Sequence, residues 1–248
     1  MKKSSLSDRC REIILGSILG DGSLKIHKPY KNARFSIRHS MTQKEYFLWK
    51  VNQLKEISGE KSVWEQVDKQ AWGKRKLRYQ SLALEKLSEL YRLTHYHNQL
   101  RIRRKWLNKL TPLSLCVWWL DDGSLVSDCR QGVLCTDELQ YEQLLIIVRY
   151  FRKVWKLNPR IGRVAKNGPR ANQYRLWIRS SEDLKSLFRV ILPHVPVPSM
   201  IRKVLILYKD PQLQERWISE MCKLSQFDRN TILSYLRQRK HKLAYYRE

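Results

Sequence analysis

The sequence is short of acidic residues: its 248 residues include 23 Asp and Glu but 49 Lys and Arg, a net charge of +26. The cationic excess is present in both halves, with 25 Lys and Arg against 10 Asp and Glu through residue 110 and 24 against 13 after it. We therefore expect both halves to contact a polyanion such as nucleic acid. Glycine is also scarce at 9 residues, and with 9 Trp and 12 Tyr the chain is not a disordered basic segment. The charge alone does not exclude a basic protein of the ribosomal type.

Long apolar runs are also missing from the sequence. No segment approaches the ~20 apolar residues that a membrane-spanning helix requires, so we expect no membrane partner. The apolar segment 13–19 is too short and runs into Asp21, which disfavours a signal peptide. The five cysteines contain no Cys-x-x-Cys pair, which argues against disulfides and a structural zinc site. We expect an intracellular protein, in the bacterial cytoplasm or in an organelle such as a mitochondrion or chloroplast.

One short apolar pattern occurs twice in the sequence. Residues 14–22 read ILGSILGDG and residues 115–123 read LCVWWLDDG, so each apolar run stops at an Asp-Gly pair. Two similar carboxylates, Asp21 and Asp122, each closing an apolar helix, suggest two half-sites around one pseudo-twofold axis. In a chain this basic, we expect duplex nucleic acid to be bound across that axis.

The segments around the two copies predict the same order of elements, which is helix, two strands, helix, two strands, helix. In the first half we expect helices over 8–19, 43–57 and 82–93 and strands over 25–26, 33–39, 62–67 and 74–81. In the second half we expect helices over 112–122, 138–155 and 180–192 and strands around 125, 132–136, 159–165 and 172–179. Further helices are expected over 200–208, 211–222 and 228–239. The pattern predicts an α+β fold with an N-terminal half (1–110), a C-terminal half (111–209) and a basic helical extension (210–248).

The position of the two aspartates indicates a metal. The C-terminal end of a helix carries a partial negative charge, so a carboxylate there is disfavoured by about 0.3–1 kcal/mol. A divalent cation such as Mg²⁺ or Mn²⁺ reverses this effect, because it binds carboxylate, water and phosphate oxygens. Such a metal polarises a phosphodiester and lowers the pKa of an attacking water. One Asp-Gly pair alone is only a turn, but two in matching halves favour metal-dependent DNA cleavage.

The first motif also has glycines four residues apart. Gly16 and Gly20 leave one face of the helix on which the backbone of another helix can approach closely. Interior glycines cost about 1 kcal/mol relative to alanine, so close packing is a reasonable compensation. The second copy has Val117 and Trp118 in this region, so its contact face must differ.

Several expected strands alternate cationic or polar side chains with apolar ones. Antiparallel ribbons of this kind enter a major groove, where Arg binds guanine and Gln binds adenine. One such strand is more often a solvated sheet face, but several together favour a shared groove-reading surface. The basic helical extension (210–248) is equally compatible with a solvated face or with contact to phosphates. The candidate DNA-binding residues are Lys25, Arg34, Ser36, Arg38, Lys74, Lys76, Arg78, Gln80, Arg163, Gln173, Arg175, Trp177, Arg179, Arg239 and Lys240.

On these motifs, residues 8 to 209 resemble a LAGLIDADG homing endonuclease of the single-chain, two-motif type. The matching motif positions are the third, eighth and ninth in the first copy and the last two in the second, namely Gly16, Asp21, Gly22, Asp122 and Gly123. The segments 110–123 and 198–203 are similar to the branch that contains the yeast mitochondrial omega-intron endonuclease. The resemblance implies two αββαββα units with central motif helices and a saddle of strands over a long asymmetric DNA target. It implies a monomer that makes a double-strand break for intron homing.

The resemblance also implies roles for individual residues. Asp21 and Asp122 would hold the divalent metals at the scissile phosphates, and the metal site would include the preceding Gly20 and Asp121. Lys203 would be the catalytic basic residue of the second half, in the segment 198–203. Its first-half counterpart is expected in a segment that lacks the matching proline and lysine; Arg101 is the favoured candidate there, and Gln99 and Arg103 are the alternatives.

Two other functions remain as alternatives. The same fold serves RNA-binding maturases, which assist splicing of intron RNA; loss of either motif aspartate would favour this, and both are present. A transcription regulator without enzymatic activity is the third option. We expect no intein, because the sequence starts with Met1 and ends with Glu248 without splicing residues.

Overall fold

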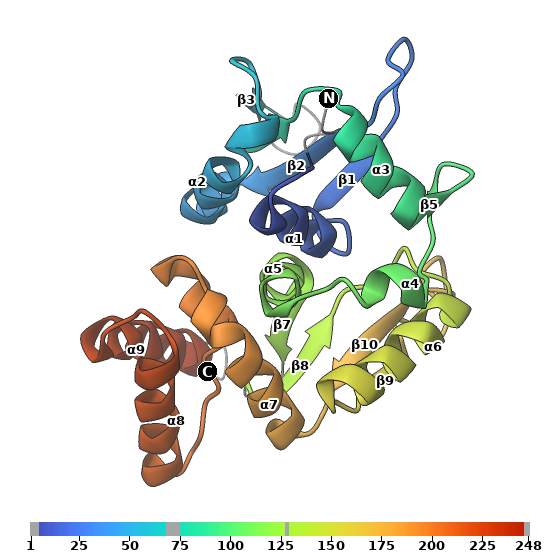
Figure 1. The fold of residues 1–248 in the computed structure, drawn as a ribbon. Helices are drawn as coiled ribbons and strands as arrows, with labels where there is room; N and C mark the ends of the chain where they lie inside the picture. Colours follow the sequence, from blue (N-terminus) through green and yellow to red (C-terminus); the bar gives the residue numbers. More distant parts are fainter. Residues whose placement is uncertain (1–4, 68–74, 127–128, 246–248) are drawn as a thin grey trace. The chain divides into compact units, whose positions relative to one another are not determined.

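The computed structural model describes residues 5–67, 75–126 and 129–245 of the chain (Figure 1). The chain divides into two compact units, Met1–Asp121 and Asp122–Glu248. None of the helices in the described residues combines the length and the apolar character that crossing a bilayer requires.

The first unit has a four-stranded antiparallel sheet in the order β1-β2-β4-β3. Its elements are α1 Asp8–Ser17, β1 Gly22–Lys25, β2 Arg34–Ser40, α2 Lys44–Gln53, β3 Val63–Val67, β4 Arg75–Gln80, α3 Glu85–Thr94, β5 His95–Tyr96, β6 Gln99–Leu100, α4 Arg104–Leu107 and α5 Pro112–Asp122. Short 3₁₀ turns at Met41–Gln43 and Lys55–Ile57 flank α2. The last residue of α5 falls in the second unit.

The alternation predicted for β2 is confirmed. Phe35, Ile37 and His39 are buried, whereas Arg34 and Arg38 lie on the other face of the sheet. The helices α2 and α3 both contact β2 (Figure 1), so the buried face of the sheet forms the core of this unit together with their apolar residues. The period of two in the sequence therefore separates a helix-covered face from a cationic face.

The second unit repeats this topology with a sheet in the order β7-β8-β10-β9. Its elements are β7 Gly123–Val126, β8 Gln131–Leu134, α6 Tyr141–Tyr150, β9 Arg160–Arg163, β10 Tyr174–Ile178, α7 Ser181–Ile191, α8 Pro211–Leu224 and α9 Arg229–Tyr245. A π-helical turn, Phe151–Trp155, extends α6, and 3₁₀ turns follow α7 at Leu192–His194 and Pro198–Lys203. Ser180 caps α7, because its hydroxyl accepts a hydrogen bond from the backbone N–H of Asp183.

The helix predicted over 200–208 is wrong. The segment forms a 3₁₀ turn that ends at Lys203, and residues 205–208 have no helical structure. Two backbone groups there bond to the buried Gln214 side chain of α8: its amide donates to the carbonyl of Ile206 at 3.2 Å, and its oxygen accepts from Tyr208 N at 3.0 Å. A side chain from a later helix thus replaces the hydrogen bonds that an α-helix would make.

Candidate active site

The two motif helices α1 and α5 pack against each other at the predicted glycine positions. A Cβ atom on Gly16 would lie 2.3 Å from the carbonyl oxygen of Ser114, and one on Gly20 would lie 2.5 Å from the Cβ of Asp121. The Ser114 hydroxyl donates to the carbonyl of Glu12 across the same contact at 2.9 Å. The expectation that Gly16 and Gly20 admit another helix is therefore confirmed, and that helix carries the second motif.

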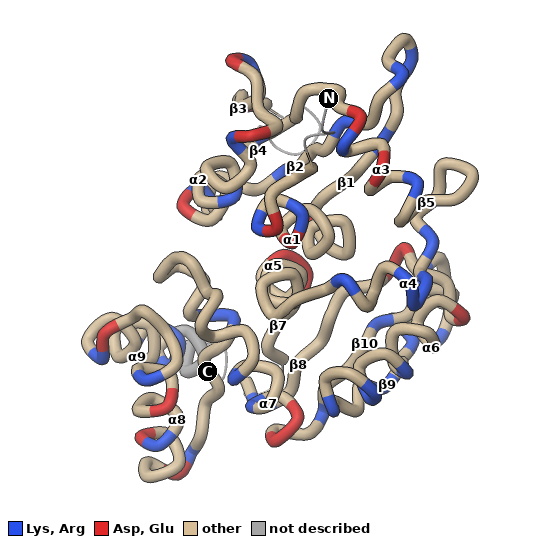
Figure 2. Tube along the Cα trace, in the orientation of Figure 1, with Lys and Arg blue, Asp and Glu red and all other residues tan. Residues whose placement is uncertain are grey.

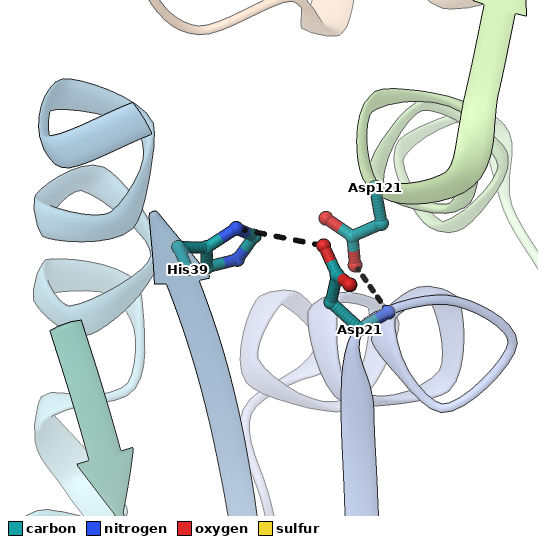
Figure 3. Close-up of side chains that lie close together, drawn as sticks. All are labelled: Asp21, His39 and Asp121. Atoms are coloured by element: carbon teal, nitrogen blue, oxygen red, sulfur yellow. Dashed lines mark hydrogen bonds and ion pairs between the residues drawn. The ribbon is translucent and has the colours of Figure 1, made fainter. Parts of the chain in front are cut away.

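Asp21 follows α1 in the turn that leads into β1, and two other side chains lie around it (Figure 3). Its side chain is 36% exposed, and its Oδ2 lies 3.5 Å from Nδ1 of His39. Its backbone N–H donates to Oδ2 of Asp121 at 3.4 Å. One potential ligand atom from each of these three residues lies within 4.8 Å of the others. The turn thus presents the partly exposed carboxylate of Asp21, and both the backbone and the side chain of this residue have polar neighbours.

Asp121 is buried and bonded to two side chains of α2. Nζ of Lys50 lies 2.6 and 2.7 Å from its two carboxylate oxygens, and the Tyr46 hydroxyl donates to Oδ1 at 3.0 Å. The side chains of Lys50 and Asp121 are both fully buried. Burial, followed by the charge of Asp121, raises the pKa of the Tyr46 phenol well above its ordinary value, so the phenol remains a neutral donor.

His39 and Lys50 were not among the predicted site residues, although their positions in the sequence are informative. His39 stands in register with Phe35 and Ile37, on the apolar face of β2. Lys50 lies one turn after Tyr46 on the apolar stripe of the helix predicted over 43–57. A titratable residue on a stripe that is otherwise buried is the signal that identifies both.

The donor set fits a divalent cation at Asp21. A partly exposed carboxylate and a nearby imidazole are chemically suited to ions such as Mg²⁺ or Mn²⁺, which bind oxygen and, for Mn²⁺, also nitrogen. The negative charge of the Asp121 carboxylate is compensated by Lys50 at 2.6 Å. Asp21 is therefore the carboxylate of this group that remains suited to a metal at the surface.

In the second unit, the charges of Asp122 and Lys203 both act on the thiol of Cys135. The Asp122 carbonyl accepts a hydrogen bond from Cys135 N at 3.1 Å. Burial raises the pKa of the Cys135 thiol; the charges of Asp122 and Asp137 raise it further, whereas Arg175 and Lys203 lower it. The turn that ends at Lys203 also contacts β7, the strand directly after Asp122. The structure thus brings Lys203 and Asp122 to the same part of this unit.

The candidate basic residue of the first half, Arg101, directly follows the β5–β6 hairpin. The Arg101 guanidinium lies over the ring of Tyr96, 5.1 Å from its centroid, and the side chain is exposed. The alternative Arg103 donates to the backbone carbonyls of Arg92 and Leu93, which end α3. Both side chains thus have local partners on the hairpin and on α3.

The sheet of the first unit gathers the predicted DNA-binding residues on one face. The strand register pairs Lys25 with Arg34, Arg38 with Arg78, and Lys76 with Ser40. Paired residues point to the same side of a sheet, so all seven described candidates share one face. These are Lys25, Arg34, Ser36, Arg38, Lys76, Arg78 and Gln80. Figure 2 marks the Lys and Arg positions of the chain in blue along the backbone trace. The eighth candidate, Lys74, lies outside the described residues.

In the second unit the candidates divide between two faces of the sheet. Arg175 and Trp177 alternate with the buried Leu176 and Ile178, and Gln173 and Arg179 flank the strand. Arg163 pairs with Tyr174 and therefore lies on the helix-covered face, away from Arg175. Arg160, which sequence reasoning missed, pairs with Trp177 and shares the face of Arg175.

The candidates of the C-terminal extension also have different surroundings. Two nitrogens of the Arg239 guanidinium lie 3.3 Å from Sγ of Cys129, so α9 is bonded to the segment between β7 and β8. Lys240 is exposed. Arg239 therefore has an evident structural contact within the second unit.

Comparisons with known proteins agree with this description. The profile of the LAGLIDADG DNA endonuclease family matches residues 11–185. The chain is 35% identical over 122 residues to a protein RecA of Mycobacterium gastri, covering 48% of this chain and 27% of that one. It is 28% identical over 213 residues to a protein RecA of Mycolicibacterium fallax, covering 81% and 47%. The chain thus spans about half, or less, of the length of these curated relatives.

A solved structure is also similar to the chain. The homing endonuclease I-WcaI bound to its DNA recognition sequence superposes with a TM-score of 0.70 at 21% sequence identity, covering 84% of this chain and 90% of that chain. At this identity the similarity shows the fold. It confirms the predicted α+β class with two sheet-containing units.

Proposed function

Because the chain belongs to the LAGLIDADG DNA endonuclease family, we propose that it is a homing endonuclease that makes a metal-dependent double-strand break in a long asymmetric DNA target. The observation that carries the proposal is the partly exposed carboxylate of Asp21, at the end of a motif whose second copy ends in Asp122. The repeats correspond to residues 1–110 and 111–209, followed by the extension 210–248. Since one chain holds both repeats, the active form is a monomer.

Each motif aspartate has a defined task in this proposal. Asp21 and Asp122 would hold divalent cations, Mg²⁺ or Mn²⁺, and the metal site would include the adjacent Gly20. The Asp121 carboxylate, which is bonded to Lys50, would support this site without binding the metal. When bound, such a cation polarises the phosphodiester and lowers the pKa of the attacking water. Lys203, near Asp122, would stabilise the negative charge that develops on the phosphate. Arg101 is the candidate for this role in the first half.

The cationic sheet faces would bind the DNA. In the first unit, Arg and Gln side chains on one face provide donors for guanine and adenine edges as well as for phosphates. The net charge of +26 adds a long-range attraction that salt weakens. We place this action inside the cell, in the bacterial cytoplasm or in an organelle, and retain intron RNA as the alternative partner of a maturase.

The test is to replace each motif aspartate in turn. A DNA duplex that the protein retains from a randomised library is cloned into a supercoiled plasmid, and the plasmid is incubated with the protein and Mg²⁺. We expect the wild type to produce linear plasmid and Asp21→Asn or Asp122→Asn to produce none, because each variant loses a ligand for the cation. Duplex affinity, measured by fluorescence anisotropy, should change little. Linear product at the wild-type rate from either variant would refute the proposal.

A further inference from the structure

Asp21 lies against a charged cluster of His39, Lys50 and Asp121, and the described positions of the second unit that align with His39 and Lys50 have a different chemistry. The two sheets have matching registers, in which Ile37 pairs with Tyr79 and Leu134 pairs with Leu176. The same spacing along the chain aligns Lys50 of α2 with Ile147 of α6. Both side chains are fully buried. A position that holds an apolar core residue in one repeat therefore holds a lysine in the other.

Lys50 has a partner in the second motif, at a position where the two motif copies differ. Asp121 occupies the motif position that Gly20 occupies in the first copy, directly before the motif aspartate. Its carboxylate lies between α1 and α2, where the lack of a side chain on Gly20 leaves room for it. Burying a charged group is costly unless an opposite charge and hydrogen bonds compensate it. Lys50 and Tyr46 supply both, at 2.6 and 3.0 Å.

The compensated carboxylate acts on the turn that carries Asp21. Oδ2 of Asp121 bonds to Nζ of Lys50 and accepts the backbone N–H of Asp21. Since Lys50 and Tyr46 are buried on α2, this contact ties the Asp21 turn to that helix. On the other side, Nδ1 of His39 lies 3.5 Å from the Asp21 carboxylate and 3.0 Å from Oε1 of Gln43.

The positions of the second unit that align with His39 and Lys50 hold different side chains. The residue aligned with His39 is Thr136, whose hydroxyl donates to the carbonyl of Tyr174 at 2.9 Å. The residue aligned with Lys50 is Ile147, whose side chain has no polar atom. The two motif aspartates are therefore supported by different chemistry.

We propose that Lys50 and Asp121 form a positioning pair that holds the Asp21 turn for metal binding, so that cleavage of one DNA strand depends on this pair and cleavage of the other does not. This inference rests on the proposed endonuclease function. It assigns Lys50 a role at a distance, because its amino group is buried and acts on Asp21 through Asp121.

The experiment removes both charges at once so that no buried charge is left alone. The variant combines Lys50→Ile, which copies the second unit, with Asp121→Ala. Its matched control is Ile147→Val, a mild change at the aligned position. Each protein is incubated with Mg²⁺ and a target duplex whose two strands are labelled at opposite ends, so that cleavage of each strand is measured separately. The strand that depends on each motif is identified beforehand with Asp21→Asn and Asp122→Asn.

We expect the double variant to cleave the Asp21-dependent strand at least tenfold more slowly and the other strand at close to the wild-type rate. On a plasmid, nicked circles should then accumulate before linear product. The control should leave the ratio of the two strand rates unchanged. Equal slowing of both strands would show a general structural effect and overturn the proposal, as would unchanged rates on both strands.

A second measurement separates this inference from the proposed function. Free Mn²⁺ is followed by electron paramagnetic resonance as it is titrated into the protein without DNA. We expect the double variant to lose the same Mn²⁺ binding that Asp21→Asn loses, whereas the control retains it. Wild-type Mn²⁺ binding by the double variant would refute the positioning role. Failure of the wild type to cut any selected duplex would refute the endonuclease function, whatever the titration shows.

Discussion

The two units share one sheet topology but bury different chemistry behind the sheet. Both sheets place the strand after the motif at one edge and pair it with the next strand. Behind the first sheet lie His39 and the buried Lys50, whereas the aligned positions of the second unit hold Thr136 and Ile147. The same backbone arrangement therefore tolerates either a charged or an apolar interior. The charged version lies next to Asp21.

The outer sheet faces differ as well. In the first unit the hydrogen-bond partners of Arg34 and Arg78 include neutral glutamines, Gln80 and Gln66. In the second unit Arg175 bonds to both oxygens of Asp137 at 2.7 and 2.8 Å, and its guanidinium lowers the pKa of that carboxyl group. A carboxylate compensates part of the positive charge there. We therefore expect the first unit to contribute more of the electrostatic affinity for DNA.

The largest expected effect comes from removing the buried lysine alone. Lys50→Ala leaves the Asp121 carboxylate in the core without its cation, and an uncompensated buried charge of this kind costs about 3–5 kcal/mol. We expect the free energy of unfolding to fall by that amount. Urea unfolding followed by tryptophan fluorescence measures the change.

The matched control is the variant in which the interior of the first unit becomes apolar. Lys50→Ile combined with Asp121→Ala removes both members of the pair, and replacing a buried ion pair by apolar residues is often neutral or even stabilising. The double variant should therefore be more stable than Lys50→Ala. If the two were equally destabilised, lost packing rather than an uncompensated charge would explain the result.

A smaller effect is expected from the outer faces. Arg78→Ala removes a cation from the exposed face of the first sheet, and loss of one phosphate contact reduces the slope of log K against log salt by about 0.9. Arg163→Ala is the control, because Arg163 pairs with Tyr174 on the helix-covered face. Fluorescence anisotropy at several salt concentrations measures both. An equal change in slope for the two variants would contradict the assignment of faces.

The sequence predicted those parts of the fold that depend on local periodicity. The helix α5 was predicted with its observed bounds, and the alternation of β2 placed Phe35 and Arg38 on opposite faces as observed. The helix predicted over 200–208 failed because a side chain from α8, which is later in the chain, bonds to that backbone. Local pattern does not contain such a contact.

The same distinction between local pattern and long-range contact explains which parts of the candidate site could be predicted. Asp21 and Asp122 stand out because the repeat marks them, whereas the partner of Lys50 lies 71 residues away in the chain. Helical periodicity identifies which face Lys50 occupies, but it does not identify the carboxylate opposite. Arg163 was grouped with Arg175 because strand composition does not reveal register, and the register places the two on different faces.

The smallest expected effect concerns a histidine at the end of α3, in a position where the second unit is apolar. His95 stacks on Tyr91 with ring centroids 4.5 Å apart, and the same spacing along the chain aligns it with the buried Leu192. Burial, assisted by the charge of Lys25, lowers the pKa of His95 to about 4. The ordinary value of about 6.5 applies to the unfolded chain.

The sign of the pH dependence follows from these two values. Well above pH 6.5 the imidazole is neutral in both the folded and the unfolded protein, so its titration does not change the free energy of unfolding there. Between about pH 6.5 and 4 the unfolded chain takes up a proton that the folded protein does not, and stability falls as the pH falls. Because the side chain is partly exposed, we expect a loss of about 1 kcal/mol. His95→Leu, which copies the second unit, should reduce this loss in urea unfolding at pH 7.5 and 4.5; an unchanged difference between the two pH values would assign the acid sensitivity to other groups.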